Sequence, residues 1–183
     1  MALCDYLIAA DITGFDCEHP MVKGAESMGL LINRSDIDTF TISNFSVTAL
    51  TLKCGGKVAF TVKQGGKQPF VGTQQEFVEG TYGNSLTNTV QFIVMEQTSD
   101  SAIDLFALAN GEFVAILPDK MGNYQVYGLE NGLHCTGQVR ELYNEDTLAG
   151  WQVTMVEENA SRGNLFTTAT IFTNLQTPTS ACT

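Results

Sequence analysis

Residues 113–124 read FVAILPDKMGNY, five apolar residues followed by a turn and then an aromatic residue. Branched and aromatic residues favour strands. The Pro, Asp, Gly and Asn of residues 118–123 are typical turn formers. The pattern predicts a β-hairpin in which a strand over Glu112–Leu117 pairs with a strand over Tyr124–Gly128.

Toward the C-terminus the same kind of pattern continues. Leu129–Gly132 is a further turn, and Trp151, Val153 and Met155 alternate with polar residues in the period of two that a half-buried strand requires. We expect strands over three stretches, with a polar tail after them: Gly137–Tyr143, Gly150–Glu157 and Leu165–Phe172.

Toward the N-terminus the strands are equally frequent. Alternation from Thr41 to Leu52 changes face near Ala49, which predicts a bulge there. The Gly-Gly pair within Cys54–Lys57 predicts a hairpin turn to a strand over residues 58–62. Further strands are expected at Met28–Ile32, Gln74–Thr81 and Thr87–Glu96, the last apolar on both faces and hence central in the sheet or at an interface.

One helix is predicted at Ser101–Asn110. Ala102, Leu105, Phe106 and Ala109 recur at helical spacing, and Asn110-Gly111 is a typical C-terminal cap. The expected fold is mainly β: a β-sandwich or open barrel of about seven to nine antiparallel strands with one short α-helix. We expect a single domain over residues 1–183, with an N-terminal segment at 1–40 and a C-terminal arm at 173–183.

The charge of the chain excludes some partners. Twenty acidic and nine basic residues give a net charge of −11, so a phosphate-binding surface is not expected. Charged residues are only 16% of the chain, against about a quarter in ordinary domains, which indicates a neutral polar surface or one in contact with other chains.

The cysteines do not form a recognisable disulfide framework. There are five, widely spaced and without a C-x-x-C pair: Cys4, Cys17, Cys54, Cys135 and Cys182. Reduced thiols in a cytosolically made protein are expected. Residues 1–10 are apolar but lack the basic start of a signal peptide, and no run approaches the length of a membrane span.

No catalytic, cofactor-binding or metal-binding residues are predicted. His134 and Cys135 are neighbours on an expected strand and therefore point to opposite faces. Cys17 and His19 have no second ligand pair at metal spacing. The carboxylates of Asp36-Ile37-Asp38 and of Glu141, Glu145 and Asp146 lack calcium-loop spacing. No enzyme activity and no cofactor are expected.

The order of elements resembles the tail tube (major tail) proteins of long-tailed bacteriophages. The similarity is carried by residues 113–124, quoted above, and by Tyr127–Leu133, a Gly/Asn-rich turn passage. It implies a virion protein, made and assembled in the host cytoplasm, that forms stacked rings, six-fold in the family, with other tail proteins as neighbours. It also implies that DNA passes through the lumen without specific binding, and that no membrane is involved.

An acidic ring suits that role, because six copies at −11 carry about −66 (six times −11) and repel phosphates. The candidate stacking segments are residues 1–35, Gly65–Gly83 and the C-terminal tail, and Thr87–Glu96 is the candidate ring contact.

Three alternatives remain open. Another virion protein, such as a capsid decoration, head fibre or connector, needs the same β-rich chain. A carbohydrate-binding β-sandwich would need an aromatic platform, for which Tyr82 and Tyr124 are candidates, since Trp151 is expected in the core. A hydrolase using two carboxylates is the third.

Overall fold

Three strands form the middle of the molecule: β1 (Met28–Asn33), from the N-terminal part of the chain, and the consecutive strands β7 (Glu112–Pro118) and β8 (Tyr124–Tyr127). The computed structural model describes residues 25–64, 69–79, 83–94, 98–140, 150–163 and 165–182. Within them the remaining elements are η1 (Arg34–Asp36), β2 (Ile37–Ser43), β3 (Ser46–Leu52), β4 (Phe60–Lys63), β5 (Gln74–Val78), β6 (Ser85–Val94), α1 (Ser99–Asn110), β9 (Leu133–Arg140), β10 (Trp151–Ala160), β11 (Leu165–Thr167) and α2 (Ala169–Asn174).

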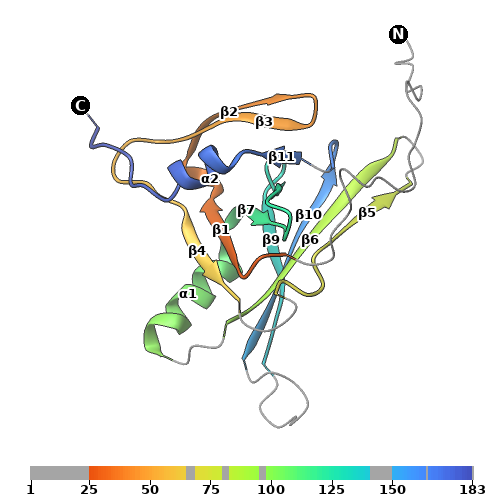
Figure 1. Ribbon diagram of the computed structural model, residues 1–183. Helices are drawn as coiled ribbons and strands as arrows, with labels where there is room; N and C mark the ends of the chain where they lie inside the picture. Colours follow the sequence, from red (N-terminus) through yellow and green to blue (C-terminus); the bar gives the residue numbers. More distant parts are fainter. Residues whose placement is uncertain are drawn as a thin grey trace.

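The strands form one mixed sheet with open edges (Figure 1). Its order is β2-β3-β11-β8-β7-β9-β10-β6-β5, and β1 pairs with β7 on one side and β4 on the other. Every described pair is antiparallel except β11 with β3. The mainly-β prediction with a short helix is confirmed, with eleven strands in the described part of the chain rather than seven to nine.

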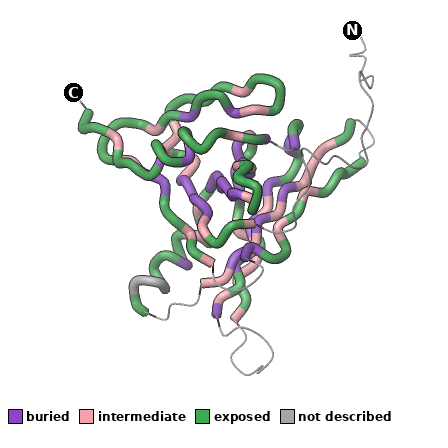
Figure 2. The backbone as a smooth tube through the Cα atoms, in the orientation of Figure 1, coloured by how far each residue is buried: buried purple, intermediate pink, exposed green. Residues whose placement is uncertain are grey.

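Two hydrophobic cores lie on the two faces of β1 and β7. Val114 and Ile116 face the first core, together with residues of β3, β11 and α2. Phe113, Ala115 and Leu117 face the second, together with residues of β6, β9, β10 and α1. A strand buried on both faces reads as a continuous apolar run. This double burial is the reason why residues 113–117 have no polar member. Figure 2 shows the buried residues along these central strands and a mostly exposed β2–β3 hairpin.

The second core is enclosed by a curved path of strands, β4-β1-β7-β9-β10-β6. One side chain joins the two ends of this path. The Gln64 amide nitrogen donates to the Ile93 carbonyl oxygen at 2.9 Å, and the Ile93 backbone N–H donates to the Gln64 amide oxygen at 2.8 Å. The Gln64 side chain therefore makes the pair of hydrogen bonds that a neighbouring strand would make with Ile93. β4 and β6 themselves are not paired.

Several predicted hairpins are confirmed. β7 and β8 pair as expected, and the bulge predicted near Ala49 is present as a shift in pairing between Thr41–Ala49 and Ile42–Val47. The strand signals from Thr41 to Leu52 belong to two strands, the end of β2 and β3, because Asn44 and Phe45 form a turn with φ of 47° and 59°. Positive φ at both central residues is typical of a two-residue hairpin, but Phe is an unusual choice there.

The Gly55-Gly56 turn has the predicted positive φ angles, 97° and 76°, but it does not make a hairpin. β4 pairs with β1 instead of β3. The C-terminal residues occupy the space beside the turn: the Gly55 N–H donates to the Ser180 carbonyl and the Thr179 N–H to the Lys57 carbonyl, both at 2.9 Å.

A disulfide joins Cys54 to Cys182, with 5.1 Å between their Cα atoms. The expectation of reduced thiols is therefore wrong for these two residues. Nothing in their spacing of 128 residues suggests the pair, because it arises from the tail packing against the β3–β4 turn. Residues 173–182 are thus held against the domain, and the predicted last strand is a short strand, β11, followed by α2.

Of the expected N-terminal segment, residues 1–24 lie outside the described residues. Residues 28–33 and 37–40 belong to the sheet, and η1 connects them. The helix starts two residues earlier than predicted, and its apolar face is different. Leu105 is buried and Leu108 packs on the second core, whereas Phe106 is 74% exposed. None of the described helices is long and apolar enough to cross a membrane.

Candidate assembly surface

His134 and Cys135 do not form a catalytic pair. They lie on β9, where His134 is exposed and Cys135 is half-buried against the second core. The Cys135 sulfur lies 3.6 Å from the Gly137 carbonyl oxygen. This arrangement follows the alternation of a strand. Cys17 and His19 lie outside the described residues.

The carboxylates singled out from the sequence are dispersed. Asp36 forms an ion pair with Lys57 at 2.8 Å and accepts a hydrogen bond from Asn33 at 3.0 Å. Burial alone would raise the pKa of Asp36, but these two hydrogen bonds and the positive charges of Lys57 and Lys53 together outweigh it and lower the pKa below the ordinary value. Asp38 lies exposed on β2. Glu141, Glu145 and Asp146 lie outside the described residues, and the described part of the chain holds no group of metal-ligating side chains.

Glu157 is the one buried carboxylate among the described residues, at 1% exposure, and no motif in the sequence singles it out. Its oxygens accept four hydrogen bonds, from the backbone N–H groups of Gly128, Glu130 and Asn131 and from the Asn88 amide nitrogen, at 2.6–3.2 Å. All four donors are from the protein itself. The carboxylate therefore holds the 128–132 turn onto β10, and no open position remains for a substrate.

Of the aromatic residues considered for a sugar platform, the described ones are used in packing. Tyr124 packs against Phe172 with 4.8 Å between ring centroids. Trp151 is half-buried against the second core, as expected, and the Arg140 guanidinium lies 5.7 Å from its ring centre. Burial raises the pKa of Tyr127 to about 12, so this hydroxyl stays protonated. Tyr82 lies outside the described residues.

An apolar pocket of about 590 Å³ opens between β4, β6 and α1, beside the Gln64 bridge. Most of its lining is apolar, and its ionisable residues are Lys63 and Asp104. The lining includes Phe60, Val62, Phe92, Leu105 and Leu108. A pocket with such a mainly apolar lining can accept an apolar side chain.

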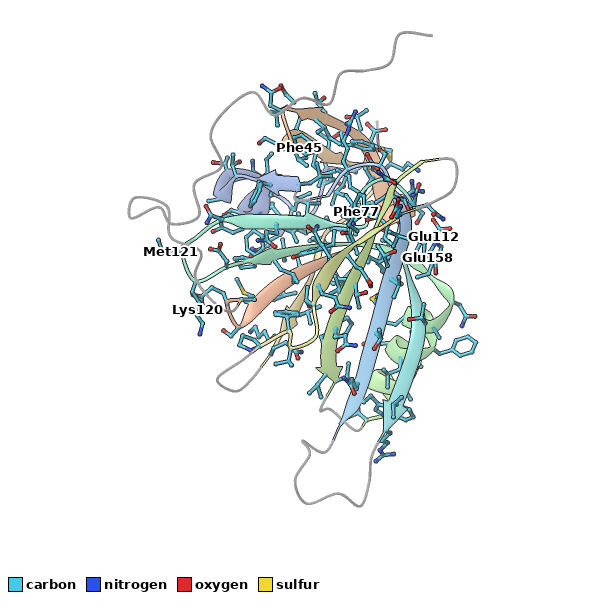
Figure 3. The ribbon with its side chains drawn as sticks, turned by 90° about the vertical axis from the view of Figure 1, so that its right-hand side faces the viewer. Phe45, Phe77, Glu112, Lys120, Met121 and Glu158 are labelled. Carbon is cyan, nitrogen blue, oxygen red and sulfur yellow. A yellow bond between two sulfur atoms is a disulfide. The ribbon has the colours of Figure 1, made fainter. Side chains whose placement is uncertain are left out.

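Large apolar side chains are exposed along the open edges of the sheet. Four of them lie on edge strands: Phe40 on β2, Phe60 on β4, and Phe77 and Val78 on β5. Phe45, at the tip of the β2–β3 hairpin, is exposed as well; Figure 3 labels it and Phe77. Single exposed apolar residues are common, but their repetition along unpaired strands is typical of surfaces that other chains cover.

The candidate ring contact, Thr87–Glu96, corresponds to β6 up to Val94, and residues 95 and 96 lie outside the described residues. β6 pairs with β10 on one side and with β5 over residues 85–89 on the other, and Val90 and Phe92 are buried in the second core. The outer strand at this end is β5.

Comparison of the chain with protein-family models, curated proteins and solved structures finds no match.

Proposed function

We propose that this chain is a structural subunit that assembles with copies of itself, most specifically as a phage tail tube protein that stacks as rings around an acidic lumen. One observation carries the proposal: the sheet is open at β2, β4 and β5, and each of these edge strands presents a large exposed apolar side chain. An isolated chain with such edges is prone to pair with other chains.

Two further features support the role. The described residues hold no metal-ligand cluster, and the described carboxylates and histidine are dispersed or used for structure. The net charge of −11 suits a lumen through which DNA slides, since close negative charges repel phosphates. The proposed partners are copies of this chain in a six-fold ring and other tail proteins in the virion.

The test is negative-stain microscopy of the purified full-length protein over a range of concentrations, with sedimentation in parallel. Rings or tubes with a central channel are expected. A protein that stays monomeric at every concentration contradicts the proposal, and trimers without ring species favour a capsid decoration or fibre. As a second readout, labelled duplex DNA should not be retained by the assembled protein even at low salt, where phosphate binding is strongest.

A further inference from the structure

β4 and β5 both have a free edge, β4 beside an apolar pocket and β5 with an exposed phenylalanine. β4 pairs with β1 on one side, and no described strand pairs with its other side, where the 590 Å³ pocket opens. β5 pairs with β6 on one side and carries Phe77, whose side chain is 62% exposed. We propose that the β5 edge of one copy pairs with the β4 edge of a second copy, with Phe77 facing the pocket.

The charges favour β4 over β2, the other free edge, as the partner of β5. β5 carries Glu76 and is followed by Glu79, β4 ends in Lys63, and β2 carries Asp38. Lys63 forms no ion pair with a described residue, so its ammonium group is available. Opposite charges across a strand pair are stabilising and like charges are destabilising. A β5 edge therefore pairs favourably with β4 and unfavourably with β2.

The faces of the two strands agree with this pairing. In an antiparallel register with Lys63 opposite Glu76, Val62 lies opposite Phe77 and Thr61 opposite Val78. Val62 lines the pocket and packs on the second core. Residues directly opposite share a face of the sheet, so Phe77 is on the pocket side and the Lys63–Glu76 pair is on the outer side.

The pocket is large enough for the side chain. An apolar cavity of about 150 Å³ accepts a benzene molecule, and the pocket beside β4 has about 590 Å³. Filling it with Phe77 would cover Phe60 and Val62 from solvent. The contact thus adds apolar burial to the backbone hydrogen bonds of the strand pair.

The pairing also sets the symmetry of the assembly. β4 and β5 are different surfaces on opposite sides of the molecule (Figure 1). A contact between unlike surfaces is head-to-tail, so it repeats from copy to copy and closes into a ring when the rotation permits. This inference rests on the proposed function and names the surfaces that would join neighbouring subunits.

The first experiment is cysteine crosslinking of the full-length protein. The variant Thr61→Cys/Val78→Cys places two thiols opposite each other across the proposed contact, and mild oxidation should give a ladder of covalent oligomers. The control, Thr41→Cys/Val78→Cys, tests the β2 edge and should stay uncrosslinked. Peptide mass spectrometry identifies the 61–78 bond. Crosslinking of the control as readily as the test variant would overturn the proposal.

The second experiment exchanges the charges. Lys63→Glu and Glu76→Lys should each raise the concentration at half assembly by about tenfold, and the double variant should restore it. Lys120→Glu, in the β7–β8 turn on a different side of the molecule from Phe77, is the matched control and should have no effect (Figure 3). A double variant as impaired as either single variant contradicts the pairing.

The outcomes separate the two proposals. Rings without the 61–78 crosslink would support the ring function and contradict the pairing of β5 with β4. Crosslinked chains that never close would support the pairing and contradict the ring. A monomer that never crosslinks, at the highest concentration the protein reaches, would contradict both.

Discussion

Glu157 shows how one residue can organise a region far from it in sequence. Its buried carboxylate binds the 128–132 turn and reaches Asn88 on the neighbouring strand. Next to it, the Asn131 side-chain nitrogen donates to the carbonyl oxygens of Glu158 and Asn159 at 3.0 Å. The turn between β8 and β9 is therefore held to β10 from both sides.

Glu157→Gln should lower the free energy of unfolding by about 2–4 kcal/mol, because the amide can accept at only one of its two ends and leaves buried N–H groups without partners. Urea denaturation measures the change. The matched control is Glu158→Gln, an exposed neighbour, for which we expect a change within about 0.5 kcal/mol. Equal effects of the two substitutions would contradict the role of Glu157.

Asp119 links stability to pH. Burial alone would raise the pKa of Asp119, but hydrogen bonds from the Asn123 side chain and from the Asn123 and Met121 backbone outweigh it and lower the pKa below 3.8. A lowered pKa in the folded state gives stability that is present above the ordinary value and is lost as the pH falls through the folded value.

Asp119→Asn should therefore reduce the stability lost on acidification below about pH 4. The measurement is urea denaturation of wild type and variant from neutral pH down into that range. Asp38→Asn is the control, because the Asp38 carboxylate accepts no hydrogen bond within the described part of the chain. A variant with the same acid-induced loss as the wild type would show that the turn hydrogen bonds do not carry the effect.

At the scale of elements, local patterns predict what local chemistry controls. The hairpin over residues 112–128 was predicted because an apolar run, a Pro/Asp/Gly turn and an aromatic strand all indicate one structure. The turn at Asn44-Phe45 was missed because Phe45 carries no signal for a positive φ. The helix was predicted but its apolar face was not, since Phe106 fits the helical period as well as Leu105 does.

Features that depend on distant partners could not be predicted from the sequence. The Cys54–Cys182 disulfide, the failure of Gly55-Gly56 to make a hairpin, and the burial of Glu157 all depend on segments more than 25 residues away. A carboxylate on a strand looks like a surface residue until the turn that binds it is known. The free edges of β4 and β5 likewise follow from the order of strands in the sheet.

The disulfide should be the strongest single link between the tail and the domain. Removing it in Cys54→Ser/Cys182→Ser should lower the free energy of unfolding by about 2–5 kcal/mol, because the bond closes a long loop in the unfolded chain. Thermal denaturation with and without reductant measures this. Reductant should lower the melting temperature of the wild type and leave the double variant unchanged; equal sensitivity would mean that another thiol pair is responsible.

At the scale of the whole molecule, exposed apolar side chains should make the isolated chain bind hydrophobic dyes. If β5 of one copy pairs with β4 of the next as proposed, fluorescence of a dye such as anilinonaphthalene sulfonate should be high in dilute protein and fall as assembly proceeds, because that contact covers Phe60 and Phe77. Light scattering on the same samples gives the degree of assembly. Phe77→Ser should lower the starting signal, and Met121→Ser, at an exposed turn, is the control. Dye binding that is unchanged by assembly would contradict the coverage of these residues.

The placement of β1 and β7 between two cores has a mechanical consequence. Alternate residues of the same strands support opposite halves of the molecule, so neither half can melt while the other stays intact. Heat, denaturant or a pulling force on the chain should therefore meet a single all-or-none transition, with no stage at which one half is unfolded and the other is not.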